Sequence, residues 1–268
     1  MCIRDSYDIA TDAKPDDIER LFRNTIPVGK QFGVIMVLED GHEYQVATFR
    51  AEAGYTDGRR PGNVRFTDAH EDALRRDFTI NALYAHPATL AIDDYFGGLG
   101  DLAARRVRFI GDAETRIRED HLRILRYFRF ATRFGDDWDA EASAACAALA
   151  PTLKGLSRER VGWELQNLLA LPDPAPTAAR MRELGVLPEV LPECGTREID
   201  QLVRLIAAED SAGIPADPMR RLAALLPPLW HAPCAPGAAL RADAPDAGLS
   251  VREAVAAAAA RVTAAGSV

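Results

Sequence analysis

The stretch of the sequence most suited to chemistry covers residues 116–130 and reads RIREDHLRILRYFRF. One carboxylate in this stretch is followed by arginines at every third position: Asp120, then Arg123, Arg126 and Arg129. Successive residues of an α-helix are about 100° apart, so these side chains would lie on one side of a helix and face away from an apolar side. The sequence therefore predicts one amphipathic helix over 112–134 whose polar side is almost entirely guanidinium.

A polar side of this kind has two explanations. In the first, it is an ordinary solvated face, on which Asp–Arg pairs three residues apart stabilise the helix by roughly 0.2–0.5 kcal/mol each. Solvated faces usually alternate in charge sign, however, and this one does not. In the second, the like charges repel one another and favour binding of an anion. Guanidinium groups match phosphate oxygens, so a triphosphate is the ligand that the pattern predicts.

Asp120 and Arg123 together predict a choice among nucleobases. Cytosine and adenine both carry an exocyclic amine, from which a carboxylate can accept a hydrogen bond. Arg123 could donate to the neighbouring ring acceptor. Uracil and guanine have a carbonyl at that place, and two acceptors facing each other in a dry pocket would cost about 1–3 kcal/mol. The pair is therefore expected to admit C and A and to reject U and G.

Composition limits the classes of protein to which the chain can belong. Its 268 residues are 48% hydrophobic and 27% charged, which is typical of globular proteins with more than one packed unit. We expect no membrane partner, because no apolar run approaches the ~18 residues of a membrane span, and no signal peptide. Four scattered cysteines without metal-ligand spacing predict reduced thiols and a cytoplasmic location.

The charge pattern argues against a protein that coats nucleic acid indiscriminately. The net charge is −8, although residues 101–134 hold nine arginines against five acids and form a basic region within the acidic chain. The histidines are scattered and are expected to be structural or solvent-facing: His42, His70, His86, His121 and His231. Trp138, Trp163 and Trp230 are expected to pack rather than to stack on bases.

The first part of the chain mixes strands with helix. Two β-rich runs, 33–39 and 43–50, flank Asp40-Gly41, a dipeptide typical of a hairpin turn. The other expected elements are a helix over 16–22, a loop over 51–69, a partly helical segment over 71–84 and a strand leading into a turn over 90–98.

From about residue 112 onward the periodicity is helical only, so the predicted fold class is α+β followed by all-α. The expected helices cover 112–134, 139–149, 157–171, 175–184, 196–208 and 216–226. Residues 227–248 are rich in Pro and Ala and are predicted to form a linker. Ser250 and Glu253 form a capping box for a final Ala-rich helix.

Six motifs along the chain resemble class II CCA-adding tRNA nucleotidyltransferases and their relatives, the bacterial poly(A) polymerases. Besides the arginine stretch with its preceding IGDAET, they are YDIATDAKPDDIERLF, VATFR, EDALRRDFTINAL, IDDYFGGLGDLAARRVRFIGD and LSRERVGWEL. The resemblance covers roughly residues 7–205. It implies a β-polymerase-like nucleotidyltransferase head, a mixed sheet with helices, over 1–110. It further implies a helical neck that selects the nucleotide and binds RNA over 111–172, and a helical body fragment over 173–268.

The resemblance also implies an activity and the residues that perform it. The family adds C, C and A to the 3′ end of tRNA from CTP and ATP, with Mg²⁺ and without a template. By motif position, Asp8 is the catalytic and metal-binding carboxylate, and the nucleotide contacts are Arg76, Asp120, Arg123, Arg126 and Arg129. Sequence alone identifies Arg75-Arg76 only as a basic pair, for which a surface position is the simpler explanation.

The chain departs from the family at the metal site. Two Mg²⁺ ions require two carboxylates, which a D-x-D strand places on one face. Here Ser6 stands where the first carboxylate belongs, and Asp8 is the second. Gln45 stands where the family commonly has an acid, and neither Glu43 nor Asp5 is expected to replace the missing ligand.

The ends of the chain depart from the family as well. The glycine-rich segment that cradles the phosphates is absent before Cys2-Ile3-Arg4-Asp5, so we expect a chain that has lost its true N-terminus and has low activity. Loss of that part would also leave a sheet edge exposed. The C-terminus looks short for the family's body and tail.

Two alternatives remain open at this point. The first is a bacterial poly(A) polymerase that uses ATP on RNA 3′ ends. The segment GKQFGVIMV, residues 29–37, lacks the basic residue and the histidine of that branch, which favours CCA addition. The second is a non-catalytic tRNA- or RNA-binding remnant, which Ser6 and Gln45 motivate. Addition of C alone or A alone, and the oligomeric state, are not predicted by the sequence.

Overall fold

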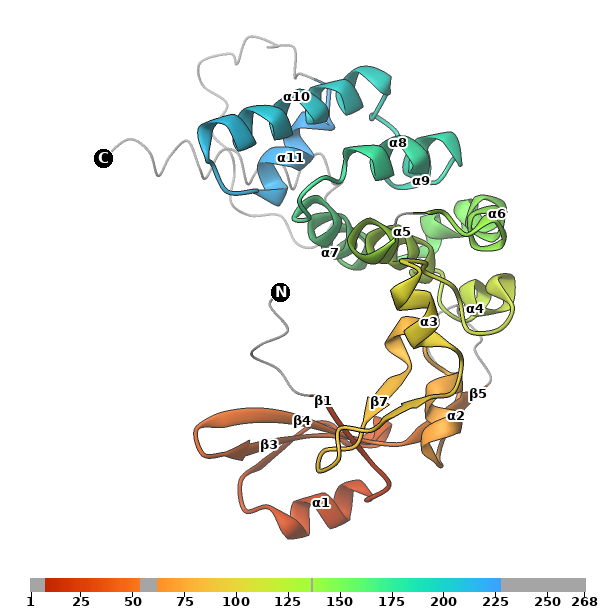
Figure 1. Ribbon diagram of the computed structural model, residues 1–268, viewed down its shortest axis with the longest axis vertical. Coiled ribbons are helices and arrows are strands. Elements are labelled where there is room, and N and C mark those ends of the chain that lie inside the picture. The colour runs from red at the N-terminus through yellow and green to blue at the C-terminus, as the bar shows by residue number, and fades with distance from the viewer. Residues whose placement is uncertain (1–7, 54–61, 136, 228–268) are drawn as a thin grey trace, which may run out of the picture. The chain divides into compact units, whose positions relative to one another are not determined.

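The computed structural model describes residues 8–53, 62–135 and 137–227 (Figure 1). The chain divides into two compact units, residues 1–120 and 121–268, here called the head unit and the helical unit. The predicted division at residues 110 and 172 stays a prediction. Several sequence features lie outside the described residues: Cys2, Asp5, Ser6, Trp230, His231, Cys234, the segment 228–248 and the capping box of Ser250 and Glu253.

A four-stranded sheet forms the first part of the head unit, in the order β1-β4-β3-β2. Its strands are β1 (Asp8–Thr11), β2 (Thr25–Gly29), β3 (Val34–Glu39) and β4 (His42–Thr48). β1 runs parallel to β4, and the other pairs are antiparallel. Asp40 and Gly41 both have positive φ, 49° and 77°, at the turn between β3 and β4. The predicted hairpin is confirmed.

One helix covers one face of this sheet (Figure 1). It is α1 (Pro15–Leu21), and it confirms the predicted helix over 16–22. Ile18 of α1 packs with Ile35 and Val37 of β3 and Val46 of β4, all nearly inaccessible to solvent. Because side chains alternate along a strand, the residues between these positions point to the opposite face.

The predicted loop over 51–69 is wrong in part, because a second, two-stranded sheet lies there. β5 (Arg50–Ala53) pairs antiparallel with β6 (Asn63–Phe66). Residues 54–61 lie outside the described residues. The Asp72 carboxylate accepts the backbone N–H of Arg50, so a contact from a later helix supports a strand that the local composition does not favour.

The rest of the head unit contains short elements: α2 (Ala69–Leu74), the 3₁₀ helix η2 (Thr79–Asn81), β7 (Leu83–Ala85), β8 (Ile92–Asp94), α3 (Gly98–Ala103) and α4 (Ala113–Glu119). The predicted strand over 90–98 is confirmed as β8, and 71–84 is partly helical as expected. Helix α3 was not predicted. The buried Asp101 of α3 accepts hydrogen bonds from Thr79, Arg106 and Arg108 and thereby anchors it.

All the regular elements that the structure describes in the helical unit are helices. They are α5 (Arg123–Phe134), α6 (Ala140–Leu149), η3 (Ala150–Gly155), α7 (Arg158–Leu169), α8 (Ala175–Glu183), α9 (Leu187–Val190), α10 (Thr196–Ala212) and α11 (Pro218–Ala224). The five helices predicted after residue 135 are confirmed. The short α9 was not predicted.

The single helix predicted over 112–134 is wrong. Helix α4 ends at Glu119, and Asp120 follows it in an extended conformation, with φ −145° and ψ 107°. Helix α5 begins at Arg123. Neither glycine nor proline marks this break, and the spacing of the arginines continues undisturbed beyond it, so periodicity alone could not show it.

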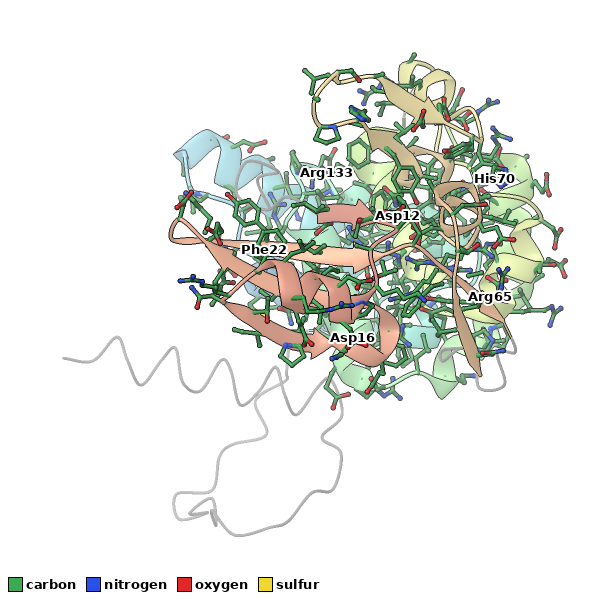
Figure 2. All side chains as sticks on the ribbon, turned by 90° about the horizontal axis from the view of Figure 1, so that it is seen from below. Asp12, Asp16, Phe22, Arg65, His70 and Arg133 are labelled. Atoms are coloured by element: carbon green, nitrogen blue, oxygen red, sulfur yellow. The ribbon has the colours of Figure 1, made fainter. Side chains whose placement is uncertain are left out.

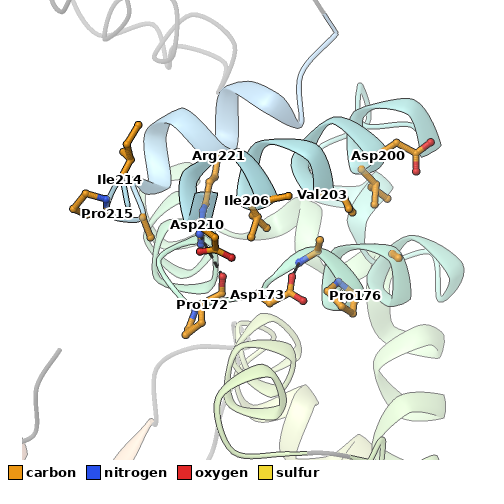
Figure 3. Close-up of a pocket in the computed structure, with 15 residues that line it drawn as sticks. Pro172, Asp173, Pro176, Asp200, Val203, Ile206, Asp210, Ile214, Pro215 and Arg221 are labelled. Carbon is orange, nitrogen blue, oxygen red and sulfur yellow. Dashed lines mark hydrogen bonds between the residues drawn. The ribbon is translucent and has the colours of Figure 1, made fainter. Parts of the chain in front are cut away.

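A groove of about 790 Å³ lies between α8 and α10 in the helical unit (Figure 3). Apolar side chains such as Val203, Ile206 and Ile214 line it, together with Arg221. Arg221 and Glu209 are both only 2% exposed and form an ion pair of 2.8 Å. Arg221 also donates to the carbonyl of Leu169, so this pair fixes the end of α7.

None of the described helices is long and apolar enough to cross a membrane.

Candidate functional site

Asp8 is the first described residue of β1 and is exposed. Its cross-strand neighbour is Gln45 of β4, whose own neighbour on β3 is Met36. This row lies on the sheet face opposite α1, since Val46, the next residue of β4, is buried against α1. The face on which Asp8 lies is therefore the one that α1 leaves uncovered.

The donor set around Asp8 fits a divalent cation only in part. A carboxylate is a hard oxygen ligand of the kind that Mg²⁺ prefers, and the amide oxygen of Gln45 is a neutral one. Among the described residues there is no group of three or more His, Cys, Asp or Glu side chains arranged to hold a metal ion. One carboxylate is thus in place, and position 6, where a second is expected, lies outside the described residues.

Arg76 is only partly exposed and is held by several contacts, whereas the simpler explanation of the Arg75-Arg76 pair was an exposed surface position. It follows α2 and donates to the Asp72 carboxylate, to the Tyr84 hydroxyl and to the carbonyl of Asn81. Its guanidinium carbon lies 5.0 Å from the centre of the Tyr84 ring. About one-third of the side chain (34%) remains exposed to solvent, although these contacts hold the guanidinium in place.

The other polar residues of the RRDFTIN motif form hydrogen bonds that stabilise the local backbone. The Asp77 carboxylate accepts from the backbone N–H of Phe78 and from the side chain of Asn81, both at 2.9 Å. Thr79 donates to Asp101 at 2.7 Å. The Asp77 bonds close the turn after Arg76, and the Thr79 bond connects that turn to α3.

Nearby aromatic residues in the head unit also have structural roles. His70, which Figure 2 labels, packs its ring against the rings of Tyr95 and Phe96. The ring centroids are 5.2 and 5.5 Å away. His86 accepts backbone N–H bonds within its own turn. Both histidines agree with the structural or solvent-facing positions expected for them.

The apolar side of α5 agrees with the prediction for its sequence. Ile124, Leu125, Phe128 and Ala131 are buried, and Tyr127 packs with Phe128 and Trp138. Trp138 therefore packs as expected. Trp163 does not: it is 56% exposed, with the Arg129 guanidinium 5.9 Å from its ring.

The arginines of α5 do not form a face without a negative charge. Glu164 of α7 is 1% exposed and accepts from Arg129 at 2.6 Å, and it lies 3.7 Å from Arg126. Arg123, at the start of the helix, is itself nearly buried at 8% exposure. Part of the repulsion that the sequence implied is therefore offset by a carboxylate from another helix, and the guanidiniums of Arg126 and Arg129 are held in place by it.

Asp120 is not on the same helix as these arginines. It follows the end of α4 and belongs to the head unit, whereas Arg123 begins α5 in the helical unit. The helical angle between Asp120 and Arg123 expected from the sequence is therefore wrong, and only their spacing of three residues along the chain remains.

Three residues that organise the candidate site were missed by the sequence analysis: Asp72, Tyr84 and Glu164. Asp72 had a signal, because it lies four residues before Arg76 on a predicted helical segment. Tyr84 and Glu164 had none, since their positions relative to the arginines depend on tertiary structure.

Two protein-family models match the chain. "Poly A polymerase head domain" matches residues 3–108, and "Probable RNA and SrmB-binding site of polymerase A" matches residues 139–195. The CCA-adding enzyme of Bacillus subtilis is 44% identical over 176 residues, which are 62% of this chain and 44% of the relative. That of Bacillus velezensis is 40% identical over 197 residues, 70% of this chain and 50% of the relative.

The two matched segments and the identity to CCA-adding enzymes support the family of class II CCA-adding enzymes and poly(A) polymerases for this chain. The crystal structure of the Bacillus stearothermophilus CCA-adding enzyme in complex with CTP has a TM-score of 0.60 and 30% identity to it, covering 74% of this chain and 53% of that one. The Thermotoga maritima CCA-adding enzyme complexed with tRNA shares the fold, with a TM-score of 0.64 at 21% identity. The predicted fold class, a mixed α/β head with a helical region, is confirmed.

The chain spans about half the length of the CCA-adding enzymes it matches, from 40% to 50% for the curated relatives. The two family models cover the head and part of the helical unit. What the whole protein does is therefore inferred from these parts.

Proposed function

We propose that this chain is the nucleotide-binding part of an enzyme that adds C and A to the 3′ end of tRNA from CTP and ATP. The observation that carries the proposal is 40–45% sequence identity to CCA-adding enzymes over about 160–200 residues. The buried and ion-paired arginines of the two units add to it. Scattered cysteines, of which Cys146 and Cys194 are buried thiols, support a cytoplasmic location.

In this proposal the arginines bind the nucleotide. By motif position, Arg76, Arg126 and Arg129 would donate to its phosphate or sugar oxygens, because planar guanidiniums match such acceptors. Asp120 and Arg123 would read the base through the exocyclic amine that C and A share. Discrimination against U and G then follows from the unpaired acceptors that these bases would leave.

Asp8 is proposed as the ligand of a divalent cation, Mg²⁺. A bound Mg²⁺ would neutralise the triphosphate and make the attacking 3′-hydroxyl easier to deprotonate. The partial fit of the described residues predicts weak cation binding, because a single carboxylate holds Mg²⁺ less tightly than a pair.

The test is incorporation of labelled nucleotide into a tRNA that lacks its terminal CCA, with Mg²⁺ and the full chain. Addition of two C from CTP, followed by one A when ATP is present, is the predicted result. Asp8→Asn abolishes it, and Ser6→Asp raises it. Use of ATP alone, with repeated addition, would replace the proposal by polyadenylation. Nucleotide binding without incorporation, in the Ser6→Asp variant too, would replace it by the non-catalytic binding protein.

A further inference from the structure

The carboxylate of Asp72, on α2, accepts hydrogen bonds from four different residues. Its side chain is 3% exposed. One oxygen accepts from the backbone N–H of Arg50 at 3.0 Å and from Arg75 at 2.9 Å. The other accepts from the Tyr84 hydroxyl at 2.6 Å and from Arg76 at 3.2 Å. A buried carboxylate with this many donors fixes the orientation of each of them.

The Tyr84 hydroxyl lies between Asp72 and Arg76. It donates to Asp72 and accepts from the Nε–H of Arg76 at 3.1 Å. Burial and the bond to Asp72 raise the pKa of Tyr84 well above its ordinary value, so the hydroxyl keeps its proton throughout the physiological range. The Tyr84 ring also packs against Ala73, Ala82 and Ile110, which fixes its position.

The contacts of Arg76 leave part of its guanidinium available. A guanidinium has five N–H groups. Within the part of the chain that the structure describes, Nε–H points to Tyr84 and Asp72, one N–H of Nη2 to Asp72, and one of Nη1 to the Asn81 carbonyl. One N–H on each terminal nitrogen remains, on a side chain that is partly exposed.

We propose that Asp72 and Tyr84 are positioning residues that hold Arg76 so that its two remaining N–H groups meet oxygen atoms of the nucleotide. The inference rests on the proposed function, since it takes Arg76 as a nucleotide contact. It adds that the rotamer of Arg76 is fixed before the ligand binds. An arginine held in this way loses less side-chain entropy on binding than one on an open surface.

The variant that tests this is Tyr84→Phe, which keeps the packed ring and removes only the hydroxyl. Calorimetric titration of the full chain with CTP in the presence of Mg²⁺ is the measurement. Arg76→Ala is expected to weaken binding about 10–100-fold, as loss of a charge-assisted contact does. Tyr84→Phe is expected to weaken it about 3–10-fold through a less ordered Arg76, with little change in melting temperature.

The matched control is Tyr95→Phe. Tyr95 packs its ring against that of Tyr84, with centroids 6.3 Å apart, and makes no described contact with Arg76. We expect CTP affinity unchanged in this variant. Asp72→Glu keeps the charge on a longer side chain and is expected to retain more CTP affinity than Asp72→Asn. A purely structural role for Asp72 does not require this difference in affinity.

The double variant Arg76→Ala/Tyr84→Phe separates the possible failures. If Tyr84 acts through Arg76, the double variant binds CTP no more weakly than Arg76→Ala alone. If the two effects multiply, or if Tyr84→Phe has no effect while Arg76→Ala does, the positioning inference is overturned and the proposed function stands. If Arg76→Ala itself leaves CTP affinity unchanged, the nucleotide-contact role of Arg76 is overturned.

Discussion

The head unit and the helical unit use the same chemical arrangement, a buried acid that holds two arginines. In the head unit Asp72 holds Arg75 and Arg76. In the helical unit Glu164 holds Arg126 and Arg129. The acids are 3% and 1% exposed, and their arginines are more exposed in both cases. In each unit a buried carboxylate thus fixes guanidiniums that keep part of their surface in solvent.

The two arrangements differ in where the acid comes from. Asp72 and its arginines lie in one short stretch, three and four residues apart. Glu164 lies on α7 and its arginines on α5, 35 residues away in the case of Arg129. The Asp72 arrangement therefore depends on a local turn and on Tyr84, whereas the Glu164 arrangement holds only while α5 and α7 stay packed. We expect the second to contribute more to the stability of its unit.

The largest predicted effect is that of Glu164→Leu. Removing the acid leaves two partly buried guanidiniums without this counter-charge, which should lower the free energy of unfolding by about 3–5 kcal/mol. Denaturant unfolding of the full chain, followed by circular dichroism, is the measurement. Replacing all three residues, as Arg126→Met, Arg129→Met and Glu164→Leu together, should recover most of the loss. A loss below about 1 kcal/mol in the single variant would show that the ion pairs are not what joins α5 to α7.

The next effect is that of Asp72→Asn, about 2 kcal/mol at pH 7. Burial favours the neutral acid, but Arg75, the Tyr84 hydroxyl, the Arg50 backbone N–H and Arg76 outweigh it and hold the pKa of Asp72 below its ordinary value. The stability that Asp72 contributes is therefore present above about pH 4 and is lost as the pH falls through its folded-state pKa. Unfolding curves of both proteins should converge below pH 4. A difference independent of pH would contradict an ionised Asp72.

A smaller loss, about 1 kcal/mol, is expected for Arg75→Ala. Arg75 is partly buried and bridges Asp72 and Glu52, at 2.8 and 3.3 Å. Since Arg76 and Tyr84 still satisfy Asp72 in this variant, the carboxylate is not left alone. The midpoint of thermal unfolding measures the change, and CTP affinity should stay as in the unaltered chain. Lost affinity would mean that Arg75, rather than Arg76, faces the nucleotide.

The smallest effect is predicted for Arg133→Ala, under about 0.5 kcal/mol. Arg133 is a further arginine of α5 but is exposed, and the contact described for it is with the Phe134 ring, 5.2 Å from the guanidinium carbon. The same denaturant unfolding experiment serves as the control for Glu164→Leu. A loss above about 1 kcal/mol would show that any arginine of α5 stabilises the unit, whether or not Glu164 holds it.

The parts of the fold that the sequence predicted depend on local signals. Asp40-Gly41 predicted the hairpin because both residues adopt positive φ at low cost there. The apolar repeat of Ile124, Phe128 and Ala131 predicted which side of α5 is buried. The fold of the head was predicted from the resemblance to the family, because no local sequence pattern indicates that β1 pairs in parallel with β4.

The parts that the sequence did not predict depend on contacts between distant residues. β5 and β6 are supported by the Asp72 bond to Arg50, 22 residues away. The break at Asp120 has no glycine or proline to mark it. Glu164 could not be assigned to the arginines of α5, because its contact with Arg129 exists only when two helices pack together. Contacts of this kind also determine which arginines form an ion pair with a buried acid and how much of each guanidinium is exposed to solvent.

The most direct test of the central claim is the affinity of the full chain for the four nucleotides, measured by calorimetry with Mg²⁺. If Asp120 and Arg123 select C and A, CTP and ATP bind at least about 10-fold more tightly than UTP and GTP, and Asp120→Ala removes the difference. Equal affinity for all four nucleotides, or a preference that survives Asp120→Ala, would contradict the account.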